Sequence, residues 1–360
     1  MTRFFIQLLL FCIFICVLQV IVSLDWEIKR SSETGKIQGM CVNVPVPYKP
    51  EPEVTSIQRH KSTHPELGFL WKPCITQEDN VVIGWGDTPP GSITTDSTGF
   101  ANTQDAIATK RDKEDIDIIG FGASYMEGAQ NLFHEYFSLK GYNYYNLSHG
   151  RYTLPQYNIA LKEYGLDLNP KWAVYGLNEV SFTLIPDFEK WQESDMDWFE
   201  FHSGTWCGPA AKAGFPHNVL REFPRLHRTY KSTMKKTFRG ALQNSPSQEE
   251  LVDKSKSYII EADRVCRENG INFILLLIPS KTRMINGEGA GTYLFSEMVQ
   301  ELKKRGITVI DLRDNFSKSE NPERLYYKED AHWNRTGVYR AAQEILKYIK
   351  DNEQETGGHD

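Results

Sequence analysis

The segment Ile118-Ile-Gly-Phe-Gly-Ala-Ser-Tyr-Met-Glu-Gly128 decides the fold class of this chain. It opens with a short apolar run typical of a buried strand, and Gly122 and Gly128 suit a tight turn into a helix. Ser124 stands at that turn, where helix amides and the helix dipole stabilise negative charge near its hydroxyl. Taken alone, the segment favours the plainer interpretation of Ser124 as a helix N-cap. A role as nucleophile therefore requires partners elsewhere in the chain.

The same order of strand and then helix repeats along the sequence. Short apolar runs occupy 117–122, 142–147, 172–177, 271–278 and 307–312, and amphipathic segments such as 248–269 and 293–305 lie between some of them. Nearly continuous apolar strands that alternate with helices indicate a parallel sheet covered on both faces. The pattern predicts an α/β fold with a parallel sheet of about five strands. Ligands of such sheets bind at the carboxyl ends of the strands.

Two chemically useful side chains follow the last predicted strand. The stretch Asp330-Ala-His-Trp-Asn334 offers a carboxylate and an imidazole within three residues, just before a predicted terminal helix at 337–349. A serine hydroxyl becomes an effective nucleophile when a base takes its proton, and this base is usually a histidine oriented by a carboxylate. We therefore expect Ser124 to be the nucleophile, His332 the general base and Asp330 the group that orients His332.

An acyl intermediate also needs fixed donors for its oxyanion. Gly150 follows the second predicted strand and offers a backbone amide, while Asn178 follows the third and offers a side-chain amide. Taken separately, Gly150 is typical of a turn glycine and Asn178 is typical of a helix cap. Polar sites follow the first, second, third and last strands, which is the edge where the fold predicts a binding site.

With these residues in place, the chain resembles the SGNH (GDSL-type) hydrolases, whose sequence blocks occur in this order. Ser124 matches the serine of block I, Gly150 the glycine of block II, Asn178 the asparagine of block III, and Asp330 and His332 the pair of block V. The resemblance implies a three-layer, flavodoxin-like fold and serine-dependent chemistry on an acyl ester. It also implies an oxyanion hole formed by Ser124, Gly150 and Asn178, with neither metal nor organic cofactor.

The resemblance covers roughly residues 115–350, and the sequence departs from the family pattern in three places. Ala123 replaces the usual aspartate of block I, and Glu179 replaces the common aspartate of block III. Block II aligns either on Gly150 or, one residue later, on Arg151. The nucleophile survives these changes, while the hydrogen bonds that the missing aspartate would make do not.

Another feature resembles the branch of the superfamily that O-acetylates exported polysaccharides, such as the alginate acetylation proteins. It consists of the Gly-x-Ser-Tyr form of block I together with Pro279-Ser-Lys-Thr282 after the fourth predicted strand. That branch places its Asp-x-His before its serine, whereas this chain places it after. Lys281 and Arg283 invite two interpretations, namely contact with an anionic substrate or solvated charges at a helix start, and the second is favoured.

Composition excludes several classes of function. The net charge is −6, and the 41 Lys and Arg are scattered among 47 Asp and Glu, which argues against nucleic acid as a partner. Cys41, Cys74, Cys207 and Cys266 are widely spaced and form no Cys-x-x-Cys pair, so a structural zinc site is not expected. One or two disulfides are compatible with an oxidising compartment, but their pairing is not assigned.

The first 24 residues differ from the rest of the chain. Arg3 is followed by an apolar run from Phe4 to Leu24, broken by only three polar residues. A bilayer core needs about 20 apolar residues. The run is longer than the apolar region of a signal peptide, and no Ala-x-Ala site follows it. We expect an uncleaved membrane anchor rather than a cleaved signal, and in either case an exported chain, periplasmic or extracellular, that is secreted if the segment is removed.

We divide the rest of the chain by composition. Residues 25–114 are rich in Pro, Gly, Thr and Asp and are interpreted as a lead-in of loops and short strands that packs on the main domain. Residues 115–350 form the main domain, and the aromatic-rich segment 182–247 interrupts it. That segment is interpreted as core or docking surface, with a lid over the site as the second interpretation. Residues 351–360 are expected to be a disordered tail.

These expectations combine into one leading function and two alternatives. The leading function is an exported serine esterase or acyltransferase that acts on an acylated small molecule or glycan, such as the O-acetyl groups of a cell-envelope or extracellular glycan. Ala123 keeps open a catalytically retired SGNH-fold protein that binds an envelope glycan. The apolar N-terminal segment by itself keeps open a scaffold in an envelope assembly.

Overall fold

The computed structural model describes residues 60–79, 82–83, 91–103, 116–178, 180–195, 198, 247–286, 292–328 and 330–357. The chain divides into two units, 1–59 with 196–245 and 60–195 with 246–360, and the second is a compact unit that contains all the described residues except Trp198. The predicted membrane segment and most of the predicted insertion lie outside the described residues. Among the helices of the described ranges, none is long and apolar enough to cross a membrane.

A five-stranded parallel sheet forms the centre of the second unit. Its strands, in order across the sheet, are β6 (Tyr144–Asn146), β5 (Ile118–Gly122), β7 (Trp172–Leu177), β8 (Asn272–Leu277) and β9 (Thr308–Asp311). All four neighbouring pairs are parallel. Each strand falls inside one of the five predicted apolar runs, so the predicted α/β fold with a parallel sheet is confirmed. If these five strands are numbered along the chain, their order across the sheet is 2-1-3-4-5, which is the flavodoxin-like order.

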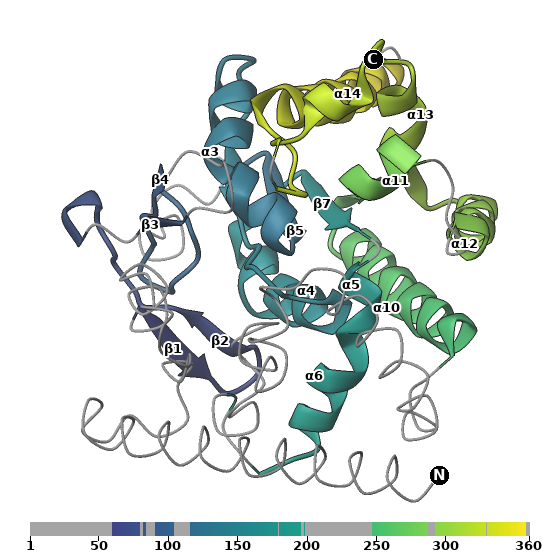
Figure 1. Cartoon of the computed structure of the whole chain (residues 1–360). Helices are drawn as coiled ribbons and strands as arrows, with labels where there is room; N and C mark the ends of the chain where they lie inside the picture. The colour runs from purple at the N-terminus through teal and green to yellow at the C-terminus, as the bar shows by residue number, and fades with distance from the viewer. Residues whose placement is uncertain are drawn as a thin grey trace, which may run out of the picture. The chain divides into compact units, whose positions relative to one another are not determined.

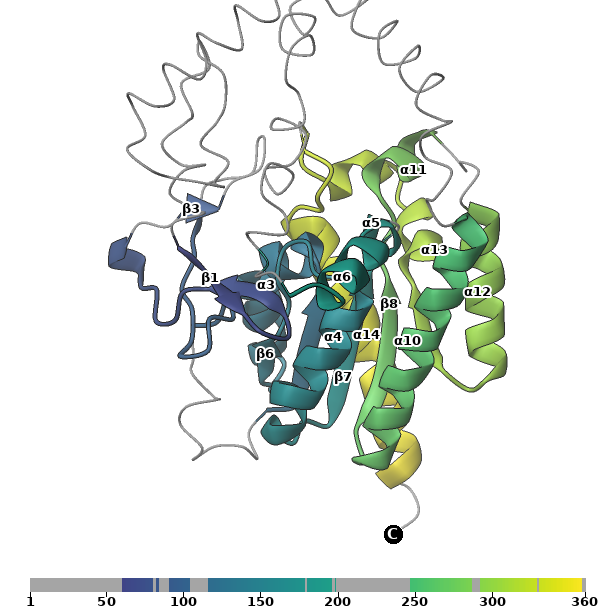
Figure 2. The same cartoon turned by 90° about the horizontal axis from the view of Figure 1, so that it is seen from below.

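Helices cover both faces of this sheet (Figures 1 and 2). One face carries α3 (Ser124–Ser138), α13 (Leu312–Ser317) and α14 (Arg335–Gly357). The other carries α4 (Leu154–Ala160), α10 (Gln248–Glu268) and α12 (Thr292–Lys304). Shorter helices are α5 (Val180–Thr183), α6 (Ile185–Gln192) and α11 (Lys281–Asn286), with a π-helical turn at Leu161–Gly165 and 3-10 turns at Gln77–Asp79, Leu166–Leu168 and Pro322–Leu325.

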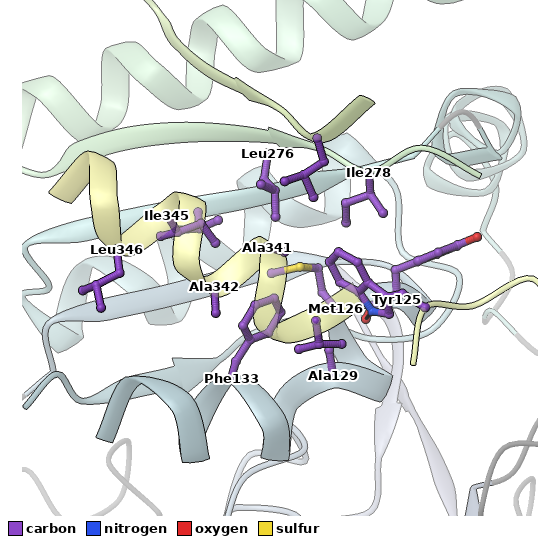
Figure 3. Close-up of a cluster of buried hydrophobic side chains, with 14 of the residues drawn as sticks. Tyr125, Met126, Ala129, Phe133, Leu276, Ile278, Ala341, Ala342, Ile345 and Leu346 are labelled. Atoms are coloured by element: carbon purple, nitrogen blue, oxygen red, sulfur yellow. Dashed lines mark hydrogen bonds between the residues drawn. The ribbon is translucent and has the colours of Figure 1, made fainter. Parts of the chain in front are cut away.

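The core between α3, α14 and the sheet fixes where α3 begins. Figure 3 shows α3 and α14 side by side over the sheet, with apolar side chains from both helices and from β8 filling the space between them. Two strand glycines lie directly beneath Met126 of α3. A Cβ added at Gly122 or Gly176 would lie 2.2 or 2.4 Å from the Met126 Cγ. These glycines therefore let the first turn of α3 rest on the carboxyl ends of β5 and β7.

The lead-in contributes two short antiparallel pairs, β1 (Lys61–His64) with β2 (Gly68–Trp71) and β3 (Val82–Ile83) with β4 (Gly91–Ser92). All four residues of β2 are buried. The buried Asp96 carboxylate accepts bonds from the Gly99 and Phe100 amides and, at 2.6 Å, from the Tyr145 hydroxyl of β6. The described lead-in thus packs against the sheet through buried polar contacts as well as apolar ones.

The C-terminal helix is longer than the sequence suggests. α14 continues to Gly357, so the first part of the tail predicted to be disordered, 351–360, is helical. A contact with a distant residue accounts for this difference, because the Tyr142 hydroxyl donates a 2.7 Å hydrogen bond to the Glu353 carboxylate. The N-terminus of α14 is capped by Asn334, whose Oδ1 accepts from the Thr336 and Gly337 amides.

The two cysteines within the described ranges are both free thiols. Cys74 is exposed and Cys266 is buried against the core. Cys41 and Cys207 lie outside the described residues.

We predict that Gly99→Ala destabilises the protein far more than Gly270→Ala. Both glycines have positive φ, 106° and 71°, but an added Cβ at Gly99 would lie 2.1 Å from the Trp71 carbonyl oxygen, while nothing lies within 4 Å at Gly270. We expect a loss of about 1 kcal/mol at Gly270 and about 3 kcal/mol or more at Gly99, measured as the free energy of unfolding in urea. Equal losses would contradict the close approach of Gly99 to the Trp71 carbonyl.

Candidate active site

Ser124 is the first residue of α3 and directly follows the end of β5. The N-cap of α3 is Ala123, which makes no side-chain cap bond, so the interpretation of Ser124 as the N-cap is wrong. The Ser124 Oγ instead lies 2.8 Å from the His332 Nε2, across 208 positions of sequence. The hydroxyl therefore sits at the positive end of a helix, within hydrogen-bond reach of an imidazole.

Asp330 holds this imidazole from its other side. One carboxylate oxygen, Oδ1, lies 2.5 Å from the His332 Nδ1 and also accepts a 2.6 Å hydrogen bond from the His332 amide. With the proton assigned to Nδ1, where the carboxylate stabilises it, Nε2 is left to accept the proton of the serine hydroxyl. The structure thus brings the three predicted catalytic residues into one chain of hydrogen bonds. This geometry can activate a serine nucleophile.

The loop that carries His332 is held by the residue next to the nucleophile. The Tyr125 hydroxyl donates a 2.7 Å hydrogen bond to the Ala331 carbonyl, and the Tyr125 ring lies 4.7 Å from the His332 ring. In return, the Trp333 Nε1 donates a 2.9 Å bond to the Tyr125 carbonyl. The start of α3 and the segment 330–334 are therefore fixed against each other on both sides of the imidazole.

Lys281 holds the same loop from the end of β8. Its Nζ donates hydrogen bonds to three backbone carbonyls, those of Tyr327 at 2.6 Å, of Lys328, and of Asp330 at 3.4 Å. Neither interpretation of Lys281 from the sequence, a solvated charge or a contact for an anionic substrate, describes this position. The ammonium group ties the loop before His332 to the carboxyl edge of the sheet. The side chain of Arg283 lies outside the described residues.

Gly150 lies next to Ser124, as the predicted oxyanion hole requires, but its amide has a partner that the sequence analysis missed. A Cβ added at Gly150 would lie 4.0 Å from the Ser124 Cβ and 2.7 Å from the Glu127 Oε2. The Gly150 amide donates a hydrogen bond to the Glu127 carboxylate. A side chain at position 150 would force the Glu127 carboxylate to move, which gives Gly150 a steric reason independent of any oxyanion.

Asn178 is buried at the carboxyl end of β7, where the sequence placed it. Its Oδ1 accepts hydrogen bonds of 3.1 Å from both the amide and the hydroxyl of Ser181. These two bonds orient the side-chain amide and leave Nδ2 as its donor group. The oxyanion role of Asn178 remains a prediction, and Glu179 lies outside the described residues.

The sequence analysis also missed His149 and Trp71, which lie beside Glu127. The Trp71 indole donates a 2.7 Å hydrogen bond to the Glu127 carboxylate and stacks on the His149 ring at 5.2 Å. Burial lowers the pKa of His149 well below its usual value, so the ring stays neutral. Glu127 carried one weak signal, because its position three residues after Ser124 places both on one helix face. Trp71 carried none.

We predict that Lys281→Met slows the reaction of Ser124 with a fluorophosphonate probe roughly 10- to 100-fold, because small displacements of a catalytic group reduce reactivity steeply. The rate of labelling under excess probe measures this effect directly. Lys304→Met, which removes an exposed lysine in the last turn of α12, is the matched control and should label at the wild-type rate. Wild-type labelling of Lys281→Met would show that the loop does not depend on this ammonium.

Comparison with known proteins bears on the part of the site that contains Asp330 and His332. Residues 238–359 match the family model described as SGNH hydrolase-like domain, acetyltransferase AlgX. No curated protein matches the sequence.

Three solved structures show a weak likeness to the chain. They are a GDSL-like lipase from Bacteroides thetaiotaomicron (14% identity, 68% of this chain and 92% of that chain, TM-score 0.40), a putative acylhydrolase from Bacteroides fragilis (14%, 70% and 97%, 0.41), and the acetyl xylan esterase AlAXEase (14%, 65% and 100%, 0.41). Likeness at this level does not establish a shared activity or substrate. The match over 238–359 makes this part of the chain similar to an SGNH hydrolase-like acetyltransferase domain, and the order of the sequence blocks along the chain resembles that of the same superfamily.

Proposed function

We propose that this protein is a serine esterase or O-acyltransferase in which Ser124 takes an acyl group from an ester. The observation that carries the proposal is the chain of hydrogen bonds from Asp330 through His332 to Ser124. The family match is independent support for acyl chemistry, since its model is that of an SGNH hydrolase-like acetyltransferase domain.

In the proposed reaction, the Ser124 Oγ attacks the carbonyl carbon of the ester while the His332 Nε2 takes the hydroxyl proton. The Asp330 carboxylate accepts a hydrogen bond from the Nδ1–H group and stabilises the imidazolium that forms, without taking its proton. The bond between the carbonyl carbon and the alcohol oxygen then breaks, and His332 gives the proton to the departing alcohol. Water or a second hydroxyl attacks the acyl-enzyme with the same base, and Ser124 is released.

The oxyanion of each tetrahedral intermediate is assigned to the Ser124 amide, at the start of α3, and to the side chain of Asn178. The Gly150 amide is the third predicted donor. Because this amide donates to Glu127 in the structure, it can reach the oxyanion only by exchanging that bond. Removal of one such donor typically lowers kcat by about 10²- to 10³-fold.

We further propose that the acyl group is an O-acetyl group of a glycan and that the protein is exported and membrane-anchored through residues 1–24. The name of the matching family and the Gly-x-Ser-Tyr form of block I support acetyl chemistry on a polysaccharide. The apolar run from Phe4 to Leu24, broken by only three polar residues, supports export. The order of serine before Asp-x-His is that of the ordinary hydrolases and keeps hydrolysis open.

A glycan-binding protein without turnover is the second candidate, and Ala123 favours it. Ala123 occupies the position of the usual block I aspartate and provides no side-chain cap to α3. The intact contact between Ser124 and His332 weighs against this candidate.

We predict that the purified protein reacts covalently with a fluorophosphonate probe at Ser124 and hydrolyses short p-nitrophenyl esters. Ser124→Ala should abolish labelling, and Asp330→Asn should lower kcat roughly 10⁴-fold because the imidazole loses its orienting carboxylate. Intact-mass measurement locates the adduct and absorbance follows the ester. A wild-type protein that neither labels nor turns over would contradict the proposed enzyme.

A second prediction separates transfer from hydrolysis. With an acetyl ester donor and an oligosaccharide acceptor, an acyltransferase should form more acetylated oligosaccharide than free acetate, since the acceptor hydroxyl outcompetes water for the acyl-enzyme. Mass spectrometry of the glycan and an acetate assay measure the two products in one reaction. Acetate alone would establish an esterase, and oligosaccharide binding that survives Ser124→Ala in a protein without turnover would establish the binding protein.

A further inference from the structure

A buried carboxylate next to the nucleophile has no part in the proposed reaction. Glu127 lies one turn after Ser124 on α3 and is only 4% exposed. The Trp71 Nε1 donates a 2.7 Å hydrogen bond to its Oε1, and the Gly150 amide donates a second bond to the carboxylate. The His149 Nδ1 lies 3.6 Å from the same Oε1. Glu127 thus joins three separate segments, namely β2, α3 and the loop after β6.

The hairpin formed by β1 and β2 covers this carboxylate. Lys61 of β1 places its Nζ 4.8 Å from the Phe69 ring centre and 4.7 Å from that of Trp71, and its charge interacts with Glu127. The Trp71 ring stacks on His149 with an interplanar angle of 20°. Burial raises the pKa of Glu127 and lowers that of Lys61 to about 8. An apolar side chain would fill this space without such a desolvation penalty, so hydrogen bonding is the property that the carboxylate adds.

The loop that receives Glu127 is tightly turned. Arg151 has φ of 74°, a left-handed conformation that is unfavourable for a residue with a side chain. The turn is closed by the His149 amide, which bonds to the Gly122 carbonyl at 3.1 Å, and by the Tyr152 amide, which bonds to the His149 carbonyl at 3.0 Å. Between these two bonds, the Gly150 amide is held by Glu127. A strained turn of this kind persists only where surrounding contacts determine it.

We propose that Glu127 is a positioning residue that fixes the loop 148–151 beside Ser124, and that Trp71 makes the lead-in hairpin a working part of the active site. The inference rests on the proposed function, because the loop borders the position where the acyl group would bind. Trp71 and Glu127 are 56 positions apart, so the hairpin acts on the nucleophile only through tertiary contact. The hairpin holds the Glu127 carboxylate in the rotamer that contacts Gly150.

Three single variants and one double variant test the inference in the full-length protein. Trp71→Phe keeps an aromatic ring against His149 and beneath Lys61 but removes the indole donor. Glu127→Gln keeps the shape of the side chain but turns one acceptor into a donor, which then faces a donor of Trp71 or Gly150. Tyr145→Phe is the matched control, because it removes a 2.6 Å buried bond between the domain and Asp96 of the lead-in, away from Glu127.

We expect kcat for p-nitrophenyl acetate to fall roughly 10- to 100-fold in Trp71→Phe and Glu127→Gln, with KM changed less than about twofold. Tyr145→Phe should keep kcat within about twofold of wild type, even where its thermal stability falls by as much as that of the other two. In the double variant Trp71→Phe/Glu127→Gln, kcat should fall no further than in the more damaged single variant, because both substitutions break the same series of contacts to Gly150.

Wild-type kcat in Trp71→Phe and Glu127→Gln would overturn the inference while the proposed function stands. The inference would also be overturned if kcat in all three single variants followed the loss of stability. A wild-type protein without turnover or labelling would overturn the proposed function and this inference together, which distinguishes the two failures.

Discussion

The packing of Met126 onto Gly122 and Gly176 sets the geometry on which the site depends. Because these two strand positions carry no side chain, the first turn of α3 rests on the carboxyl ends of β5 and β7. Ser124 consequently stands at the point where the strand order reverses, the usual ligand position in open parallel sheets. The same contact directs Tyr125 toward the loop of His332 and Glu127 toward the loop of Gly150, because successive helical residues point in different directions.

The acid–base partner of Ser124 sits on a segment without regular structure, so its position depends on hydrogen bonds from other elements. Backbone carbonyls of the segment accept bonds from the Lys281 ammonium and the Tyr125 hydroxyl, while Asn334 caps the helix that follows. Gly337 adds a steric requirement, because a Cβ there would lie 2.4 Å from the Leu325 carbonyl oxygen. A segment without regular secondary structure is thereby held in one arrangement, in which the imidazole lies between Asp330 and Ser124.

Buried polar groups dominate the opposite side of the nucleophile. Glu127 and His149 are each at most 4% exposed, and Trp71 of the lead-in donates a hydrogen bond to Glu127 and stacks on His149. Groups of this kind are costly to bury and specify one arrangement when their partners are satisfied. The lead-in therefore does more than cover apolar surface, because it supplies the Trp71 indole that donates to Glu127 next to the site.

The sequence by itself determined the five strands, their parallel arrangement, and the identity of Ser124, Asp330 and His332 as a group. Apolar runs and the residues that follow them are local features, and the fold brings the carboxyl ends of all parallel strands to one edge. Only the tertiary structure decided that Ala123 rather than Ser124 caps α3, that Lys281 binds backbone carbonyls, and that Glu127 links Trp71 to Gly150. The contacts of Lys281 and Glu127 join residues 23 to 56 positions apart. The cap of α3 depends on which partner the Ser124 hydroxyl binds. The periodicity of a sequence reports neither long-range contacts nor the choice between partners.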